Sequence, residues 1–83
     1  MSKPIDDVVT DVEVELIQAM MYWPKFASAH EGYAILLEEV DELWDIVKLK
    51  PVNRDVAAMR AEAVQIAAMA LRFIIDCCEE ERE

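Results

Sequence analysis

The sequence predicts an all-α domain, a bundle of about three helices whose packing is completed by oligomerisation. Of the 83 residues, only 1 is glycine and 3 are proline, which is fewer turn-forming residues than a small all-β domain needs. Hydrophobic residues make up 55% of the chain, too large a share for intrinsic disorder, and they recur at the three- and four-residue spacing of helices. The length accommodates one domain, 1–83, in which we expect the acidic segment 79–83 to be a frayed end.

The first helix is expected at about 4–22, where apolar side chains follow helical spacing. Pro4 suits the first turn of a helix, because the ring fixes a helical backbone angle and the missing N–H would have no partner there. Asp6 and Asp7 favour the same end, since carboxylates are stabilised by the positive end of the helix dipole. Pro24 ends the helix.

The second helix is expected to begin at a capping box, Ser28-Ala-His-Glu31, in which Ser28 caps the helix and Glu31 reaches back. It runs to about Lys48 or Leu49, because Pro51 disfavours a helical conformation at the residue before it.

The third helix is expected to begin with Asn53 as its cap and to run to about Cys78. Between 56 and 75 it is apolar on nearly every side, which is typical of a helix that is buried all round. Two other helices cannot surround it. We therefore expect further copies of the chain to cover it, in a homo-dimer or a homo-tetramer.

The charge balance excludes several classes of partner. The chain carries 8 basic and 18 acidic residues, a net charge of −10, which disfavours nucleic acid and anionic membrane surfaces. It has neither an uncharged run of 18 residues nor the apolar segment of a signal peptide, so we expect no membrane span. The two cysteines are adjacent and form no disulfide framework, which favours a cytoplasmic location.

Acidic residues occupy two different faces of the second helix. Glu38 falls with Asp41 and Asp45 on the side away from the apolar stripe, as in a solvated face. Glu39 and Glu42 fall one turn apart at the edge of that stripe. A carboxylate at such an edge needs a cationic partner, because burying an unpaired charge is costly.

The polar residues of the third helix share one narrow stripe, formed by Glu62, Gln65, Arg72 and Asp76. One interpretation is a solvent-facing strip with salt bridges, in which Arg72 balances Asp76 or Glu62. The other is that Glu62 and Gln65 face the two edge carboxylates of the second helix. That arrangement would gather oxygen ligands that suit a hard divalent cation such as Mg²⁺.

The motif Glu38-Glu39-Val-Asp-Glu42, followed after a gap by Glu62-Ala-Val-Gln65, resembles a known pattern. It is similar to the Glu-Glu-x-x-Glu…Glu-x-x-Asp pattern of the MazG-like all-α NTP pyrophosphatases, whose superfamily includes dimeric dUTPases and dCTP pyrophosphatases. The resemblance covers about 28–76. It implies a helical bundle that assembles as dimers or tetramers and hydrolyses an NTP or dNTP to the monophosphate and pyrophosphate.

The resemblance also implies roles for individual residues. Glu39, Glu42 and Glu62 would be ligands of Mg²⁺, with Mn²⁺ as a substitute, and Glu38 would join these three in the catalytic set. Gln65 would be a further ligand, at the position where the family has Asp. Its carbonyl can ligate a metal, but the side chain brings no charge and cannot act as a general base.

Two further groups are candidates for contact with a nucleotide. Four basic residues near the loop between the second and third helices are candidates for phosphate contact: Lys48, Lys50, Arg54 and Arg60. The alternative for them is pairing with a helix C-terminus. Three residues before the acidic helix are candidates for contact with the base: Trp23, Phe26 and His30. The alternative for the aromatic residues is core packing.

We therefore expect a Mg²⁺-dependent nucleoside triphosphate pyrophosphohydrolase. Two alternatives stay open. The first is a MazG-like module that binds nucleotide or metal without efficient turnover, because Gln65 replaces an acid. The second is a structural helical oligomer whose acids form only a solvated face. The sequence does not indicate which base or sugar is preferred.

Overall fold

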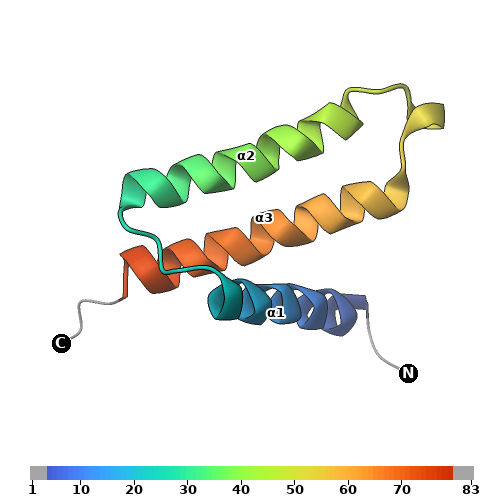
Figure 1. Cartoon of the computed structure of the whole chain (residues 1–83). Helices are drawn as coiled ribbons and strands as arrows, with labels where there is room; N and C mark the ends of the chain where they lie inside the picture. Colours follow the sequence, from blue (N-terminus) through green and yellow to red (C-terminus); the bar gives the residue numbers. More distant parts are fainter. Residues whose placement is uncertain (1–3, 80–83) are drawn as a thin grey trace.

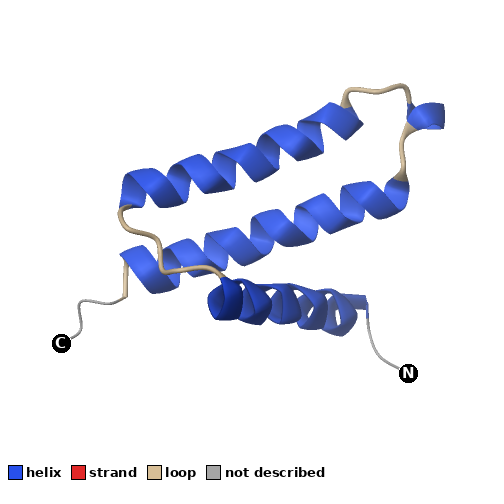
Figure 2. Cartoon of the chain, in the orientation of Figure 1, coloured by secondary structure: helices blue, strands red, loops and turns tan. Residues whose placement is uncertain are grey.

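The computed structural model describes residues 4–79 and consists of three long α-helices joined by short connections (Figure 1). Helix α1 spans Pro4–Tyr22, α2 spans Ala29–Val47 and α3 spans Val56–Cys77. A short 3-10 helix, η1 (Pro51–Asn53), lies between α2 and α3. The described part of the chain contains helices and loops but no strand (Figure 2), which confirms the predicted all-α class. The predicted frayed end falls, apart from its first residue, outside the described residues.

The first two helices have nearly the predicted bounds. The capping box that begins α2 is confirmed, because Ser28 Oγ accepts a hydrogen bond from the Glu31 N–H at 3.1 Å. The Glu31 carboxylate reaches back and accepts a hydrogen bond from the Ala27 N–H. At its other end, α2 ends at Val47, slightly earlier than predicted, and Lys48 is its C-cap.

The prediction that Asn53 caps the third helix is wrong. Asn53 lies in η1, and the cap of α3 is Asp55, whose side chain accepts a hydrogen bond from the Ala58 N–H at 3.1 Å. Pro51 is the first residue of the 3-10 turn, because its fixed backbone angle suits that position. The chain then extends through Arg54 before α3 begins.

Helix α3 is the central element, because it packs against both α1 and α2 (Figure 1). Within residues 4–79, the buried hydrophobic core consists of four residues: Ala19, Phe26, Ala68 and Met69. The molecule is a flat slab with extents of 50 × 35 × 19 Å, so its thickness is less than two helix diameters of about 10–12 Å. A slab this thin has two wide faces and little interior.

Gly32 lets the start of α2 approach α3 closely. A Cβ atom at this position would lie 2.8 Å from ring carbons of both Phe26 and Phe73. Contacts that short require neighbouring atoms to move, so a larger residue would push α2 away from the core.

A buried ion pair fastens the connection between α1 and α2 to α3. Arg72 and Asp76 are 3% and 8% exposed, and Arg72 Nε donates to Asp76 Oδ2 at 3.0 Å. The same carboxylate oxygen accepts a hydrogen bond from the Phe26 N–H at 3.0 Å. The guanidinium also donates to the carbonyl oxygens of Ala19 and Trp23, at 3.0 and 2.8 Å. One charged pair therefore holds the end of α1 and the following loop against α3.

The outward sides of α2 and α3 carry exposed apolar residues. On α2, four large side chains recur at spacings of four, three and four residues: Tyr33, Leu37, Val40 and Trp44. On α3, three such side chains lie near the C-terminal end: Leu71, Ile74 and Ile75. The charged residues Arg72 and Asp76 of α3 are buried within the chain instead. Burial of α3 on every side is therefore not achieved within one chain.

Within residues 4–79, no helix is both long enough and apolar enough to cross a lipid bilayer.

Replacing Asp76 with alanine tests the importance of the buried pair. The substitution leaves the Arg72 charge buried without a counterion and the Phe26 N–H without its acceptor. Breaking such a pair costs about 3 kcal/mol or more, so we expect Asp76→Ala to lower the free energy of unfolding by that amount. Urea denaturation followed by circular dichroism measures it.

Asp45→Ala is the matched control, because Asp45 forms an exposed pair with Lys48 at 3.1 Å. Such pairs contribute at most about 1 kcal/mol. Equal effects of the two substitutions would contradict the role assigned to the Arg72–Asp76 pair.

Candidate metal and nucleotide site

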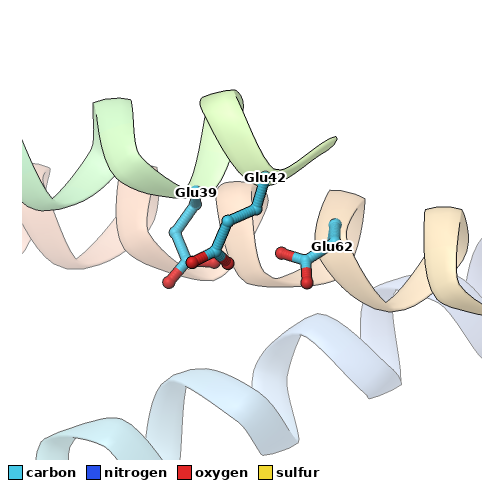
Figure 3. Close-up of side chains that lie close together, drawn as sticks. All are labelled: Glu39, Glu42 and Glu62. Carbon is cyan, nitrogen blue, oxygen red and sulfur yellow. The ribbon is translucent and has the colours of Figure 1, made fainter. Parts of the chain in front are cut away.

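Three carboxylates converge in the space between α2 and α3. Glu39 and Glu42 lie three residues apart on α2 and so project from the same side of that helix, whereas Glu62 comes from α3 (Figure 3). One oxygen from each side chain lies within 4.8 Å of the others. We call these three residues the carboxylate cluster. Such a set of oxygen atoms, supplied by facing helices, can chelate a divalent cation.

The cluster places negative charge where water has limited access. Glu39 and Glu62 are both partly buried, and Glu62 Oε1 is a buried atom without a hydrogen-bond partner in the described chain. Burial, reinforced by the charges of Glu42 and Glu62, raises the pKa of the Glu39 carboxyl to about 7. No salt bridge within residues 4–79 involves a member of the cluster. The cluster therefore has the negative charge and the unsatisfied acceptor that a cation would neutralise.

A cavity of about 510 Å³ opens beside the cluster. All three helices and the loop between α1 and α2 contribute to its wall, and Glu39 is the cluster residue that lines it. Ile35 and Met69 supply apolar surface, while Glu15 and Gln65 supply polar groups. A volume in this range suits a small organic ligand.

The structure separates the motif residues into two groups. Glu39, Glu42 and Glu62 come together as described, but Glu38 is exposed and lies outside the cluster. Gln65 turns its amide towards α1, where Nε2 donates to Glu15 Oε2 at 2.7 Å. That hydrogen bond gives Gln65 a partner other than a metal.

None of the four basic residues predicted to contact phosphate lines this cavity: Lys48, Lys50, Arg54 and Arg60. Arg60 lines a neighbouring pocket that shares Glu15 and Gln65 with the cavity. Arg54 donates from its guanidinium to the carbonyl oxygens of Val47 and Leu49, so it satisfies the C-terminal end of α2. Two others form ion pairs, Lys48 with Asp45 at 3.1 Å and Arg60 with Asp11 at 2.8 Å. Phosphate contact by these residues stays a prediction.

The three residues predicted to contact the base lie in different environments. Trp23 lines the cavity and is 69% exposed, so its ring is available to a ligand. Phe26 also lines the cavity, but it is a core residue on which the Arg72 guanidinium stacks, 5.2 Å from the ring centre. His30 is exposed and does not line the cavity.

Glu15 and Lys25 are two charged residues of the cavity wall that were not among the sequence-based site candidates. Glu15 lies on α1, among several acids of similar appearance, and nothing in its local sequence distinguishes it from Glu13. Lys25 lies in the sequence between Trp23 and Phe26, which are both predicted to contact the base. This position is the signal by which the sequence identifies Lys25 as a further candidate. It is exposed and lines the cavity.

Comparisons with known proteins give the chain no relatives: no protein-family model, no curated protein and no solved structure matches it significantly. The resemblance to MazG-like enzymes therefore depends on the motif residues alone.

The raised pKa of Glu39 predicts an unusual dependence of stability on pH in metal-free buffer. The folded chain keeps a proton on Glu39 up to about pH 7, whereas the unfolded chain loses it at the lower, ordinary pKa of a glutamic acid. The folded state thus binds more protons between these values, and the contribution of Glu39 to stability falls as the pH rises through 7.

The variant Glu39→Gln isolates this contribution, because it removes the titrating group and keeps the shape. We expect the variant to gain stability relative to the natural chain as the pH rises from 5 to 8, measured by urea denaturation in the presence of EDTA. Glu38→Gln, an exposed neighbour on the same helix, is the control. A stability difference between Glu39→Gln and the natural chain that is independent of pH would contradict the assignment.

Proposed function

We propose that this protein is a Mg²⁺-dependent nucleoside triphosphate pyrophosphohydrolase. The observation that carries the proposal is the convergence of Glu39, Glu42 and Glu62, from two helices, at the edge of a cavity of ligand size. The resemblance of the two acidic motifs to MazG-like enzymes supports the same reaction. Water would be added across the bond between the α- and β-phosphates, releasing a nucleoside monophosphate and pyrophosphate.

The residues of the cluster fit a hard divalent cation. They offer carboxylate oxygens only, which Mg²⁺ and Mn²⁺ prefer over softer ligands, and Glu62 Oε1 is a buried acceptor that lacks a donor. Glu39, Glu42 and Glu62 would hold the ion. When bound, Mg²⁺ supplies positive charge that offsets the negative charge of the triphosphate during its cleavage.

The chain's own groups would then position the substrate. The cavity beside Glu39 would receive the nucleoside, with the exposed ring of Trp23 available for stacking. Lys25 is a cation on the cavity wall and would attract the phosphates.

One observation favours a second candidate function, in which the protein binds nucleotide and cation without efficient turnover. The last position of the acidic motif is Gln65, which carries no carboxylate and donates its amide hydrogen bond to Glu15. Three carboxylates suffice for one ion, but they hold additional ions less well. The assay below separates the two functions, because binding without product supports the second.

Pyrophosphate release from a panel of NTPs and dNTPs tests the proposed reaction. We expect release in Mg²⁺, none in EDTA, and a fall of about 100-fold in the variant Glu62→Gln, which removes one charge from the cluster. Asp45→Asn changes an exposed acid of α2 outside the cluster and should leave the rate unchanged. Release of pyrophosphate that is unaffected by Glu62→Gln would contradict the assignment of the site.

We also propose that the protein acts as a homo-oligomer, either a dimer or a tetramer. The slab is 19 Å thick, four hydrophobic residues are buried within the described part of the chain, and α2 and α3 expose large apolar side chains at helical spacing. A monomer of this size with so small a core gains little stability, and an extended apolar surface is a liability in water. A second copy is the occupant we infer for this surface, because it would bring the same exposed apolar side chains of α2 and α3 to the contact. A cytoplasmic location is also part of the proposal.

Light scattering at micromolar concentration measures the mass directly. We expect a dimer or a tetramer. Trp44 is 57% exposed and belongs to the exposed apolar stripe of α2, formed by Tyr33, Leu37, Val40 and Trp44, so replacing it by Glu should shift the mass towards that of a monomer. Replacing the exposed residue Asp41 by Lys, outside the stripe, is the control and should leave the mass unchanged. A monomer mass for the natural chain would exclude the oligomer.

A further inference from the structure

The cavity wall contains a polar pair that neither the carboxylate cluster nor the core requires. Glu15 of α1 and Gln65 of α3 both line the cavity and are partly buried, and they are joined by the hydrogen bond of 2.7 Å from Gln65 Nε2 to Glu15 Oε2. The pair therefore has a defined orientation in the wall. It connects α1 and α3.

The pair leaves acceptor atoms directed at no protein donor. Gln65 donates to Glu15 through its nitrogen, so its carbonyl oxygen faces away from that bond, and the second oxygen of Glu15 accepts no hydrogen bond from residues 4–79. Glu15 also forms no salt bridge within that range. A partly buried carboxylate without a cation gains most from hydrogen-bond donors of a ligand.

The remainder of the cavity suits a flat, aromatic ligand. Ile35 and Met69 provide apolar surface, and the Trp23 ring is exposed at the wall. The backbone of Trp23 is fixed, because its carbonyl oxygen accepts a hydrogen bond from Arg72 Nη2 at 2.8 Å. Apolar walls, one stacking ring and a few oriented polar atoms are the features by which proteins recognise a nucleobase.

We infer that Glu15 and Gln65 select nucleobases that carry an amino group, namely cytosine, adenine and guanine, over uracil and thymine. The inference rests on the proposed function, and it names the class of base that the same site accepts. An exocyclic amino group donates hydrogen bonds to carboxylate and amide oxygens. Uracil and thymine present carbonyl oxygens at the corresponding positions, and a carboxylate repels them.

Binding of non-hydrolysable nucleotides tests the selection without requiring turnover. The probes are α,β-methylene analogues of CTP and UTP, and of GTP and ITP, titrated in Mg²⁺ and followed by calorimetry. The GTP and ITP analogues differ only in the amino group. Because a hydrogen bond to a charged group is worth more than a neutral one, we expect the amino-bearing member of each pair to bind about tenfold more tightly.

The variant Glu15→Gln assigns the preference to the carboxylate. Glutamine keeps the size and can still accept the hydrogen bond from Gln65, and we expect the preference within each pair to fall to about twofold or less. Glu13→Gln removes the same charge from an exposed position of α1 and should keep the preference. The comparison within the natural protein does not depend on either variant.

The outcomes separate this inference from the proposed function. Equal affinities within each pair would overturn the selection and leave triphosphate binding intact. Absence of binding by all four analogues would overturn both proposals. A preference that persists in Glu15→Gln would overturn the assignment to Glu15.

Discussion

The Arg72–Asp76 ion pair is the interaction on which the arrangement of this small protein depends. Its two members are almost fully buried, and between them they bond the backbone at Ala19, Trp23 and Phe26. Within residues 4–79 only four hydrophobic residues are buried, and partly buried side chains such as Val12, Leu16 and Phe73 pack against them, so the apolar contact between α1 and α3 is small. The charged pair adds directional hydrogen bonds that fasten the end of α1 and the following loop to α3, and residues of this loop line the cavity.

The carboxylate cluster, unlike the Arg72–Asp76 pair, destabilises the folded chain. Two unit charges about 4 Å apart repel by about 4 kcal/mol at an effective dielectric constant of 20, so three carboxylates in one place oppose folding unless they are protonated or neutralised. In the chain without a cation, burial and, after it, repulsion by Glu42 and Glu62 raise the pKa of Glu39. In proteins, ionisable groups with strongly shifted pKa values are commonly found at ligand-binding sites. The cavity that Glu39 lines agrees with a ligand-binding role for the cluster.

Most of the helical structure follows from local sequence, whereas the site depends on contacts between helices. The prolines and the Ser28 capping box predict the bounds of α1 and α2, and helical periodicity places Glu39, Glu42 and Glu62 on facing edges. The cap at Asp55 was missed because Asn53 has the same capping chemistry two residues earlier, and only the 3-10 turn decides between them. The partner of Gln65 could not be predicted either. It lies 50 residues away, and several acids of α1 have equivalent local sequence.

The central claim is that Glu39, Glu42 and Glu62 form a site for a divalent cation, and thermal unfolding in the presence of Mg²⁺ or Mn²⁺ tests it most directly. An ion that binds only the folded state at 100 times its dissociation constant stabilises by about 2.7 kcal/mol, which raises the Tm of a domain of this size by about 10–20 °C. We predict this rise for the natural chain and for Asp45→Asn, and its loss in Glu62→Gln. A Tm that does not respond to millimolar Mg²⁺ and Mn²⁺, or that rises equally in Glu62→Gln, would contradict the account.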